Sequence, residues 1–192
     1  MLLLKGLTQY IMSEIQHRMV PSIAAYTSKE FYGDALRNAV PASPSPRNFS
    51  CASQPASKVF INVDAAKEEK QESLFWDPSA IEEIVKLAKT LLVGGDVDPE
   101  DIAVFSPYAP QIEMAKERLG TEGIDLCACV SIDGAQGNEY SIVIISLVRC
   151  NEEGKLGFLD GSRRLNVGIT RAMRAWFDIN RQSAYVANPS YE

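Results

Sequence analysis

The sequence has few residues of the kinds that bind metals or form structural disulfides. Its 192 residues include one histidine, His17, and four cysteines, none of them in a C-x-x-C arrangement. This composition argues against a zinc site, so we expect reduced thiols and no bound metal. Long hydrophobic runs are also missing. The opening "MLLLKG" is too short for a signal peptide, and no run approaches the roughly 20 residues that cross a membrane. We therefore expect an intracellular protein, cytoplasmic or nuclear, without a membrane partner.

A phosphate-binding P-loop is absent as well. That motif requires G-x-x-x-x-G-K-[ST], whereas the Gly154-Lys155 pair is followed by Leu156. No apolar strand ends in an Asp-Glu pair of the kind that holds Mg²⁺ beside a nucleotide. If the protein handles a nucleoside triphosphate, it supplies only part of the site.

The charges are unevenly distributed along the chain. The formal net charge is −6, so the average surface repels phosphate and nucleic-acid binding needs a local basic patch. Residues 64–101 contain eleven acidic residues and four lysines, while residues 163–181 contain five arginines and one acidic residue. The arginine-rich region is therefore the candidate for contact with an anion.

Hydrophobic periodicity predicts strands that alternate with helices. Several expected strands are continuously apolar, which is typical of a parallel sheet covered on both faces. We therefore expect a three-layer α/β/α sandwich with a mostly parallel sheet. The expected helices cover 79–95, which has a Ser79/Glu82 capping-box pattern, 109–120 and 163–174, and the expected strands cover 59–63, 102–106, 125–133, 140–148 and 175–179.

Composition divides the chain into four predicted parts. Residues 1–37 form a helical first segment, in which Pro21 suits the first turn of a helix. Residues 38–58 are a loop insert rich in Pro and Ser, and residues 59–180 form the main α/β domain. Residues 181–192 are a tail.

In parallel α/β sheets, functional residues gather in the loops after the carboxyl ends of the strands. Two such loops are Ser106-Pro107-Tyr108 and "DGAQGNE", 133–139, and a third leads to the arginine-rich helix. The glycines of 133–139 allow backbone N–H groups to approach a phosphate, and Gln136 and Glu139 can bond sugar hydroxyls or order a water. The alternative interpretation of 133–139 is a plain turn between two strands.

The arginine-rich helix offers a second candidate. Arg164 and Arg171 are seven residues apart, so we expect them on one face of a helix over 163–174. A guanidinium held at the edge of a cleft can neutralise charge on a transferring phosphoryl group, which is worth roughly 10³ to 10⁵ in rate. Solvated surface arginines are the alternative.

Taken as a set, these stretches resemble a known family. The stretch "SIDGAQGNEYSIVIISLVRCNEEGKLGFLDGSRRLNVGITRA", 131–172, is similar to motifs V and VI of superfamily-1 helicases of the Upf-like group. "VFSPYAPQI", 104–112, and "IQHRMVPSIAAYTSKEFYGDAL", 15–36, resemble two further segments of those enzymes, the second being the Q-Y-R-M-H-P segment. The resemblance covers most of residues 12–176 and implies the second, C-terminal RecA-like domain of such a helicase, without the P-loop of the first.

The resemblance implies roles for matching positions. Arg18 and Arg171 correspond to the two arginines that contact the γ-phosphate of ATP. His17, Gln136, Gly137 and Glu139 correspond to nucleotide-binding positions. Ser106, Pro107, Tyr108 and Ser131 correspond to contacts with the nucleic-acid backbone.

The sequence also departs from the family pattern. His17 stands where a tyrosine stacks on adenine, and the alternative is an ordinary half-buried histidine. Val20 replaces a histidine, and Ser141 replaces an acidic residue that often follows the Q-G-x-E motif. After Met173, Arg174 and Asp178 interrupt the expected apolar strand, so we expect either a weak last strand or an altered end of the domain.

These observations predict the C-terminal motor domain of an ATP-dependent helicase. It would supply arginines to an interdomain ATP site and bind single-stranded RNA or DNA. ATP and Mg²⁺ would both need a first RecA-like domain, so we expect no ATPase activity from this chain alone. The alternative is a non-catalytic module, derived from a truncated helicase, that binds nucleic acid or protein. A third, weaker alternative is a decayed gene product without activity.

Overall fold

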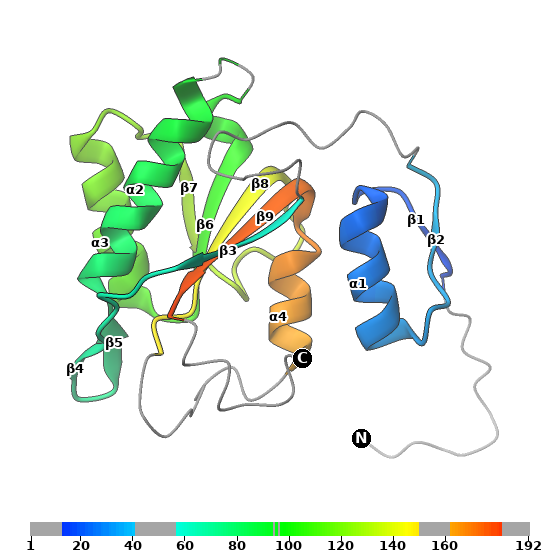
Figure 1. Cartoon of the computed structure of the whole chain (residues 1–192), viewed down its shortest axis with the longest axis horizontal. Helices are drawn as coiled ribbons and strands as arrows, with labels where there is room; N and C mark the ends of the chain where they lie inside the picture. The colour runs from blue at the N-terminus through cyan, green and yellow to red at the C-terminus, as the bar shows by residue number, and fades with distance from the viewer. Residues whose placement is uncertain (1–12, 41–56, 94, 96, 150–161, 182–192) are drawn as a thin grey trace.

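Five parallel strands form the central sheet (Figure 1). The computed structural model describes residues 13–40, 57–93, 95, 97–149 and 162–181. The strand order is β3-β9-β8-β6-β7, and every neighbouring pair is parallel. The strands are β3 (Lys58–Asn62), β6 (Ile102–Ser106), β7 (Ala128–Ser131), β8 (Tyr140–Ser146) and β9 (Ala172–Asn180).

Helices cover both faces of this sheet. One hydrophobic core lies between the sheet and helices α2 (Pro78–Val93) and α3 (Ala109–Thr121). The other lies between the sheet and helices α1 (Pro21–Tyr32) and α4 (Ser162–Ile169). The predicted three-layer α/β/α architecture is thereby confirmed. None of the described helices is both long enough and apolar enough to span a bilayer.

The central strands β6 and β8 explain why the sequence signal was strong. All five residues of β6 are buried, as are six of the seven residues of β8. A strand buried on both faces reads as a continuous apolar run, because each face packs against a helical layer. Phe105 points to the α1/α4 core and Ile144 to the α2/α3 core, and both are fully buried.

The prediction of a helix over 163–174 was wrong at its carboxyl end. Helix α4 ends at Ile169, and the chain passes through Thr170 and Arg171 into β9, which begins at Ala172. The backbone pairing of Tyr140 with Ala172 holds this segment as a strand beside β8. Arg164 and Arg171 therefore do not share a helix face.

The expectation of a weak or altered final strand was also wrong. Strand β9 has nine residues and lies between β8 and β3, with its last four residues buried. Asp178 is only 7% exposed and faces the layer that contains α1. Burial raises the pKa of Tyr26 in α1, and the charges of Glu30 and Asp178 raise it further. Polar residues at alternate positions made this strand look weak in the sequence. The sequence pattern did not show that the layer containing α1 packs on that side of β9.

Five short elements were not predicted. Strands β1 (Ile15–Gln16) and β2 (Arg37–Asn38) pair in parallel on either side of α1 in the sequence. Strands β4 (Glu69–Gln71) and β5 (Leu74–Trp76) form an antiparallel hairpin within the segment expected to be a charged connection. A 3-10 turn, η1 (Pro99–Asp101), precedes β6. Helix α1 begins at Pro21, as predicted. Most of the predicted 38–58 insert, and the tail beyond Arg181, lie outside the described residues.

The start of α2 differs from the capping box that the sequence predicted. Asp77, and not Ser79, is the cap: its Oδ1 accepts hydrogen bonds from the N–H groups of Ser79 (2.9 Å) and Ala80 (3.3 Å). The Ser79 hydroxyl donates to the carbonyl of Ala65, and Glu82 forms an ion pair with Arg118. The helix begins one residue earlier than the pattern indicated, because a buried aspartate precedes Pro78.

We predict that Asp77→Ala lowers the free energy of unfolding by about 1 to 2 kcal/mol, because two N–H groups lose their acceptor. Ser79→Ala is the matched control and is expected to change it by less than about 0.5 kcal/mol. Urea unfolding at neutral pH measures both. Burial raises the pKa of Asp77, so Asp77→Asn, which keeps the acceptor without the charge, is expected to retain the stability. Equal losses in the alanine variants would contradict this assignment of the cap.

Candidate nucleotide and nucleic-acid site

Three charged side chains from distant parts of the sequence meet at one edge of the sheet. Arg18 lies between β1 and α1, Glu139 directly precedes β8, and Arg171 directly precedes β9. An Nη atom of Arg18 lies 2.5 Å from Oε1 of Glu139. The other Nη donates a hydrogen bond to the carbonyl of Thr170 at 3.0 Å. We call Arg18, Glu139 and Arg171 the arginine cluster.

Backbone hydrogen bonds hold these three segments together. The N–H of Tyr140 donates to the carbonyl of Arg171 at 3.0 Å, and the N–H of Val20 donates to the carbonyl of Met173 at 2.9 Å. Arg171 also donates from its Nε to the carbonyl of Val167, at 3.2 Å. The cluster is thus held between the amino ends of β8 and β9 and the carboxyl end of α4.

The electrostatics of the cluster favour an anion. Arg18 donates a hydrogen bond to Glu139 and holds the pKa of that carboxyl below its usual range. Burial lowers the pKa of Arg171, and the positive charge of Arg18 lowers it further. The Nε of Arg18 is buried and has no hydrogen-bond partner among the described residues. Arg18 thus pairs with Glu139, and Arg171 lies within the electrostatic influence of both. A phosphate would satisfy both the remaining positive charge and the free donor.

An open groove of about 400 Å³ lies beside the cluster. Gln16, His17, Arg18, Met19 and Glu139 line it. His17 is exposed there, next to the two charged residues, as its proposed contact with a base requires. The other predicted nucleotide-binding residues, Gln136 and Gly137, are exposed on the loop that leads to Glu139 and do not line this groove. Gly137 has φ +93°, a conformation that favours glycine.

The arginine cluster lies at the amino ends of β8 and β9, whereas the sequence argument expected the site at the carboxyl ends. Residues 132–139 run from the end of β7 back to the start of β8 without a helix, and Ile132 and Ala135 are buried on the way. Helix α4 likewise leads back to the start of β9. Glu139 and Arg171 therefore lie at the opposite edge from Tyr108.

The carboxyl ends of β6 and β7 form a second group. Ser106 pairs with Ser131 across these strands, so both predicted nucleic-acid loops begin at one place. Ser131 is exposed, and its hydroxyl accepts a hydrogen bond from the N–H of Gly134 at 2.9 Å. Pro107 and Tyr108 are half-buried. The prediction of direct contact by Ser106 is not supported, because its side chain is fully buried and its Oγ accepts from the Tyr108 N–H.

Tyr108 contacts residues that were not predicted to belong to the site. Its ring centroid lies 5.3 Å from that of Phe75 in the β4–β5 hairpin. The guanidinium of Arg149 lies 4.4 Å from the Phe75 ring centre and forms a 3.0 Å ion pair with Glu68. Against the effect of burial, a hydrogen bond with Tyr108 and the charge of Glu68 raise the pKa of Arg149. Arg149 thus joins Glu68, Phe75 and Tyr108, and Tyr108 remains partly exposed.

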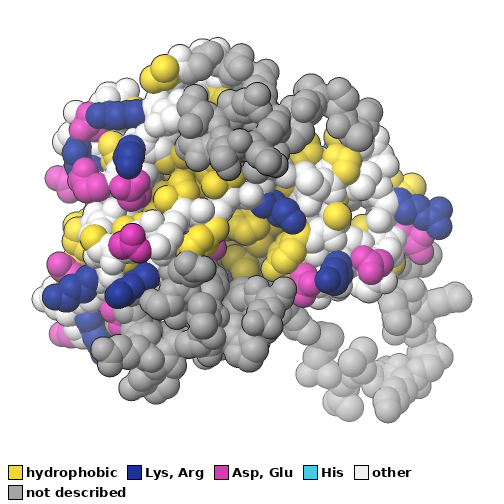
Figure 2. All heavy atoms as spheres, viewed as in Figure 1, with side chains coloured by type: hydrophobic (Ala, Val, Ile, Leu, Met, Phe, Trp, Pro, Cys, Tyr) yellow, Lys and Arg dark blue, Asp and Glu magenta, His cyan; other side chains and the backbone are white. Residues whose placement is uncertain are grey.

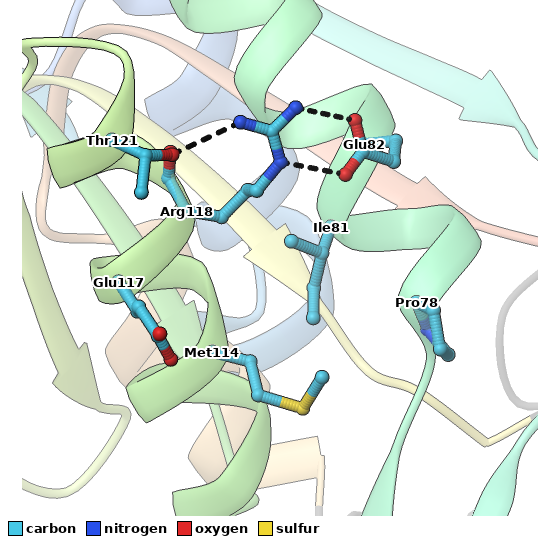
Figure 3. Close-up of a pocket in the computed structure, with 7 residues that line it drawn as sticks. All are labelled: Pro78, Ile81, Glu82, Met114, Glu117, Arg118 and Thr121. Carbon is cyan, nitrogen blue, oxygen red and sulfur yellow. Dashed lines mark hydrogen bonds and ion pairs between the residues drawn. The ribbon is translucent and has the colours of Figure 1, made fainter.

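The groove in Figure 3 is a different feature. It has a volume of about 200 Å³ and lies between α2 and α3, over Ile81 and Met114. Arg118 closes one side, in ion pairs with Glu82 and Glu122. In Figure 2, side chains of both charge signs are interleaved over α2 and α3. None of the residues predicted for the site lines this groove, so it does not belong to the candidate site.

Comparison with known proteins defines the class of this chain. A family model described as an AAA domain (AAA_12) matches residues 2–180, so the chain belongs to that family. It is 31% identical over 193 residues to the probable helicase MAGATAMA 3 of Arabidopsis thaliana, a match that covers 94% of this chain and 23% of that protein.

Two further relatives support membership of the same family. The putative regulator of nonsense transcripts 1 of Takifugu rubripes is 31% identical over 168 residues, covering 83% of this chain and 15% of that protein. The DNA-binding protein SMUBP-2 of Rattus norvegicus is 41% identical over 91 residues, covering 47% of this chain and 9% of that protein. The predicted membership of the Upf-like helicase family is confirmed. The chain spans less than a quarter of the length of these relatives.

We predict that Arg18→Ala raises the pKa of Glu139 towards that of an ordinary glutamate. Carbon-13 NMR titration of the side-chain carboxyls measures this. The folded-state pKa of Glu139 is lowered, so its ion pair stabilises the fold above the unfolded-state pKa and is lost as the pH falls through the folded-state value. Glu122, whose pKa is lowered by Lys89 and Arg118, is the internal control. An unchanged Glu139 titration would show that the ion pair does not form.

Proposed function

We propose that this chain is the C-terminal motor domain of an ATP-dependent, Upf-like helicase. The observation that carries the proposal is the convergence of Arg18 and Arg171, 153 positions apart in the sequence, around the single carboxylate of Glu139. A net positive site with a buried, unpaired guanidinium nitrogen suits the terminal phosphate of a nucleotide. Membership of the helicase family supports the same assignment.

The proposed division of labour follows from what the chain contains. Bound Mg²⁺–ATP would supply the phosphoanhydride that is cleaved, and a P-loop domain would hold the ion and the other phosphates. In this chain, Arg18 and Arg171 would bind the terminal phosphate and neutralise charge as it develops. Glu139 would then exchange Arg18 for a ribose hydroxyl, and His17 would stack against the base. We propose that the chain has no ATPase activity without such a domain.

Single-stranded nucleic acid would bind at the opposite edge of the sheet. Tyr108 and Pro107 would contact bases or sugars there, and the exposed hydroxyl of Ser131 would reach the backbone. Binding through backbone and stacking contacts tolerates different sequences and weakens with salt. On this proposal, nucleotide and nucleic acid would bind at different loops, and β6, β8 and residues 132–139 would join the two sites.

We predict that Arg171→Ala, in this domain joined to a P-loop domain, lowers the ATP turnover number at least about 10³-fold. The affinity for single-stranded RNA, measured by fluorescence anisotropy, is expected to change less than about twofold, because Arg171 lies at the other edge of the sheet. Loss of both together would indicate a role in folding. Arg174→Ala, on β9 beyond the cluster, is the matched control and is expected to retain turnover.

We predict the reverse for Tyr108→Ala. Loss of one stacking contact is expected to weaken single-strand binding by about 1 to 3 kcal/mol, equally for RNA and DNA of mixed sequence. The test is anisotropy on the isolated chain at two salt concentrations, with Tyr140→Phe as the control for the loss of a phenol elsewhere. Unchanged affinity would remove Tyr108 from the binding surface. Failure of the chain to bind either nucleic acid would favour the alternative of a module that binds a protein partner.

A further inference from the structure

The side chain of Gln16, next to the arginine cluster, makes four hydrogen bonds. It is the last residue of β1, and its side chain is half-buried. Its Oε1 accepts hydrogen bonds from the N–H groups of Arg18, at 3.0 Å, and Met19, at 2.8 Å. Its Nε2 donates to the carbonyl of Met19, at 2.8 Å, and to Oδ1 of Asn38, at 2.7 Å.

These four bonds use both hydrogens of the amide and two acceptor positions on its oxygen. The orientation of the amide is therefore fixed, since a flipped side chain would place its NH₂ against two N–H groups. Glutamate at this position would accept the same two bonds, but would face the Met19 carbonyl and Asn38 Oδ1 with a second oxygen. A shorter amide would not span from β1 to both partners. Glutamine is the residue type that satisfies this arrangement.

The bonds constrain the short loop that carries Arg18. Residues 17–19 curl around the Gln16 amide, and Met19, which is 5% exposed, anchors the end of the loop in the α1/α4 core. The Val20 N–H then bonds to the Met173 carbonyl on β9. The backbone of Arg18 is thus held on both sides. Only its side chain remains to be ordered, and restricting the backbone first lowers the entropy cost of placing that long side chain.

We propose that Gln16 is a positioning residue that directs the Arg18 guanidinium towards Glu139 and the Thr170 carbonyl. The four hydrogen bonds of the amide all go to protein atoms, so it acts through the Arg18 backbone. The functional meaning rests on the proposed role of Arg18 at the terminal phosphate. The positioning itself does not, because it is a property of the chain without nucleotide.

The test is the titration of Glu139 in the intact chain, measured by carbon-13 NMR of its carboxyl. Gln16→Met keeps the length and volume of the side chain but removes all four hydrogen bonds. We expect this variant to raise the Glu139 midpoint by most of the shift that Arg18→Ala produces. Asn38→Ala removes only the 2.7 Å bond of Nε2 and is expected to leave most of the wild-type behaviour. A Glu139 midpoint in Gln16→Met equal to that of the wild type would overturn the proposal.

Two further comparisons separate positioning from general damage. Glu122 on the far helical layer is expected to titrate identically in all variants, because its partners are Lys89 and Arg118. Gln16→Leu serves as a second variant if Gln16→Met unfolds, because it also removes all four hydrogen bonds without adding a charge; it is expected to give the same rise. An ion pair that persists in both Gln16 variants would show that Arg18 finds Glu139 without help. In the chain joined to a P-loop domain, loss of ATP turnover by a Gln16 variant with a normal Glu139 titration would count against positioning but not against the proposed function.

Discussion

The proximity of two arginine side chains, one of them paired with a carboxylate, is the constraint on which the functional interpretation depends. Like charges that are partly removed from water repel, and the lowered pKa of Arg171 reflects both burial and the charge of Arg18. Glu139 compensates for one of the two positive charges. The fold therefore maintains a site with one unbalanced positive charge and one buried N–H donor on Arg18, an arrangement that the proposed phosphate would stabilise.

The sheet makes this arrangement possible. Strands β8 and β9 are central and lie side by side, so the residues that precede them, Glu139 and Arg171, are neighbours at its amino edge. The α1/α4 layer brings Arg18 to the same place through the Val20–Met173 backbone bond. At the opposite edge, Tyr108 is braced by the β4–β5 hairpin and Arg149. A motion of α1 relative to the sheet would change the arginine cluster and leave the Tyr108 surface in place.

Much of this fold was readable from the sequence, for identifiable physical reasons. Strands β6 and β8 are continuous apolar runs because they are buried on both faces, and α2 has a regular apolar stripe. Strand β9 was underestimated, because Arg174 and Asp178 break its apolar pattern, although Asp178 is buried on the side of α1. The predicted helix extended past the true end of α4, because Ala172 fits the helical spacing. Its backbone instead pairs with β8. No hydrophobic periodicity predicted the β4–β5 hairpin, because its residues are mostly exposed.

The residues of the site were found by motif, but their arrangement was not. Arg18, Glu139 and Arg171 followed from the resemblance, yet their place at the amino edge depends on residues 132–139 returning without a helix. Gln16 stood inside a quoted motif and received no role, since an amide's partners are visible only in three dimensions. The side-chain N–H resonances of Arg18 and Arg171, followed by NMR in this chain joined to a P-loop domain as Mg²⁺ and ATP are added, test the central claim most directly. We predict that the Arg18 Nε–H resonance shifts with ATP and not with adenosine, as the buried nitrogen gains a phosphate partner. Equal responses to ATP and adenosine, or none, would contradict it.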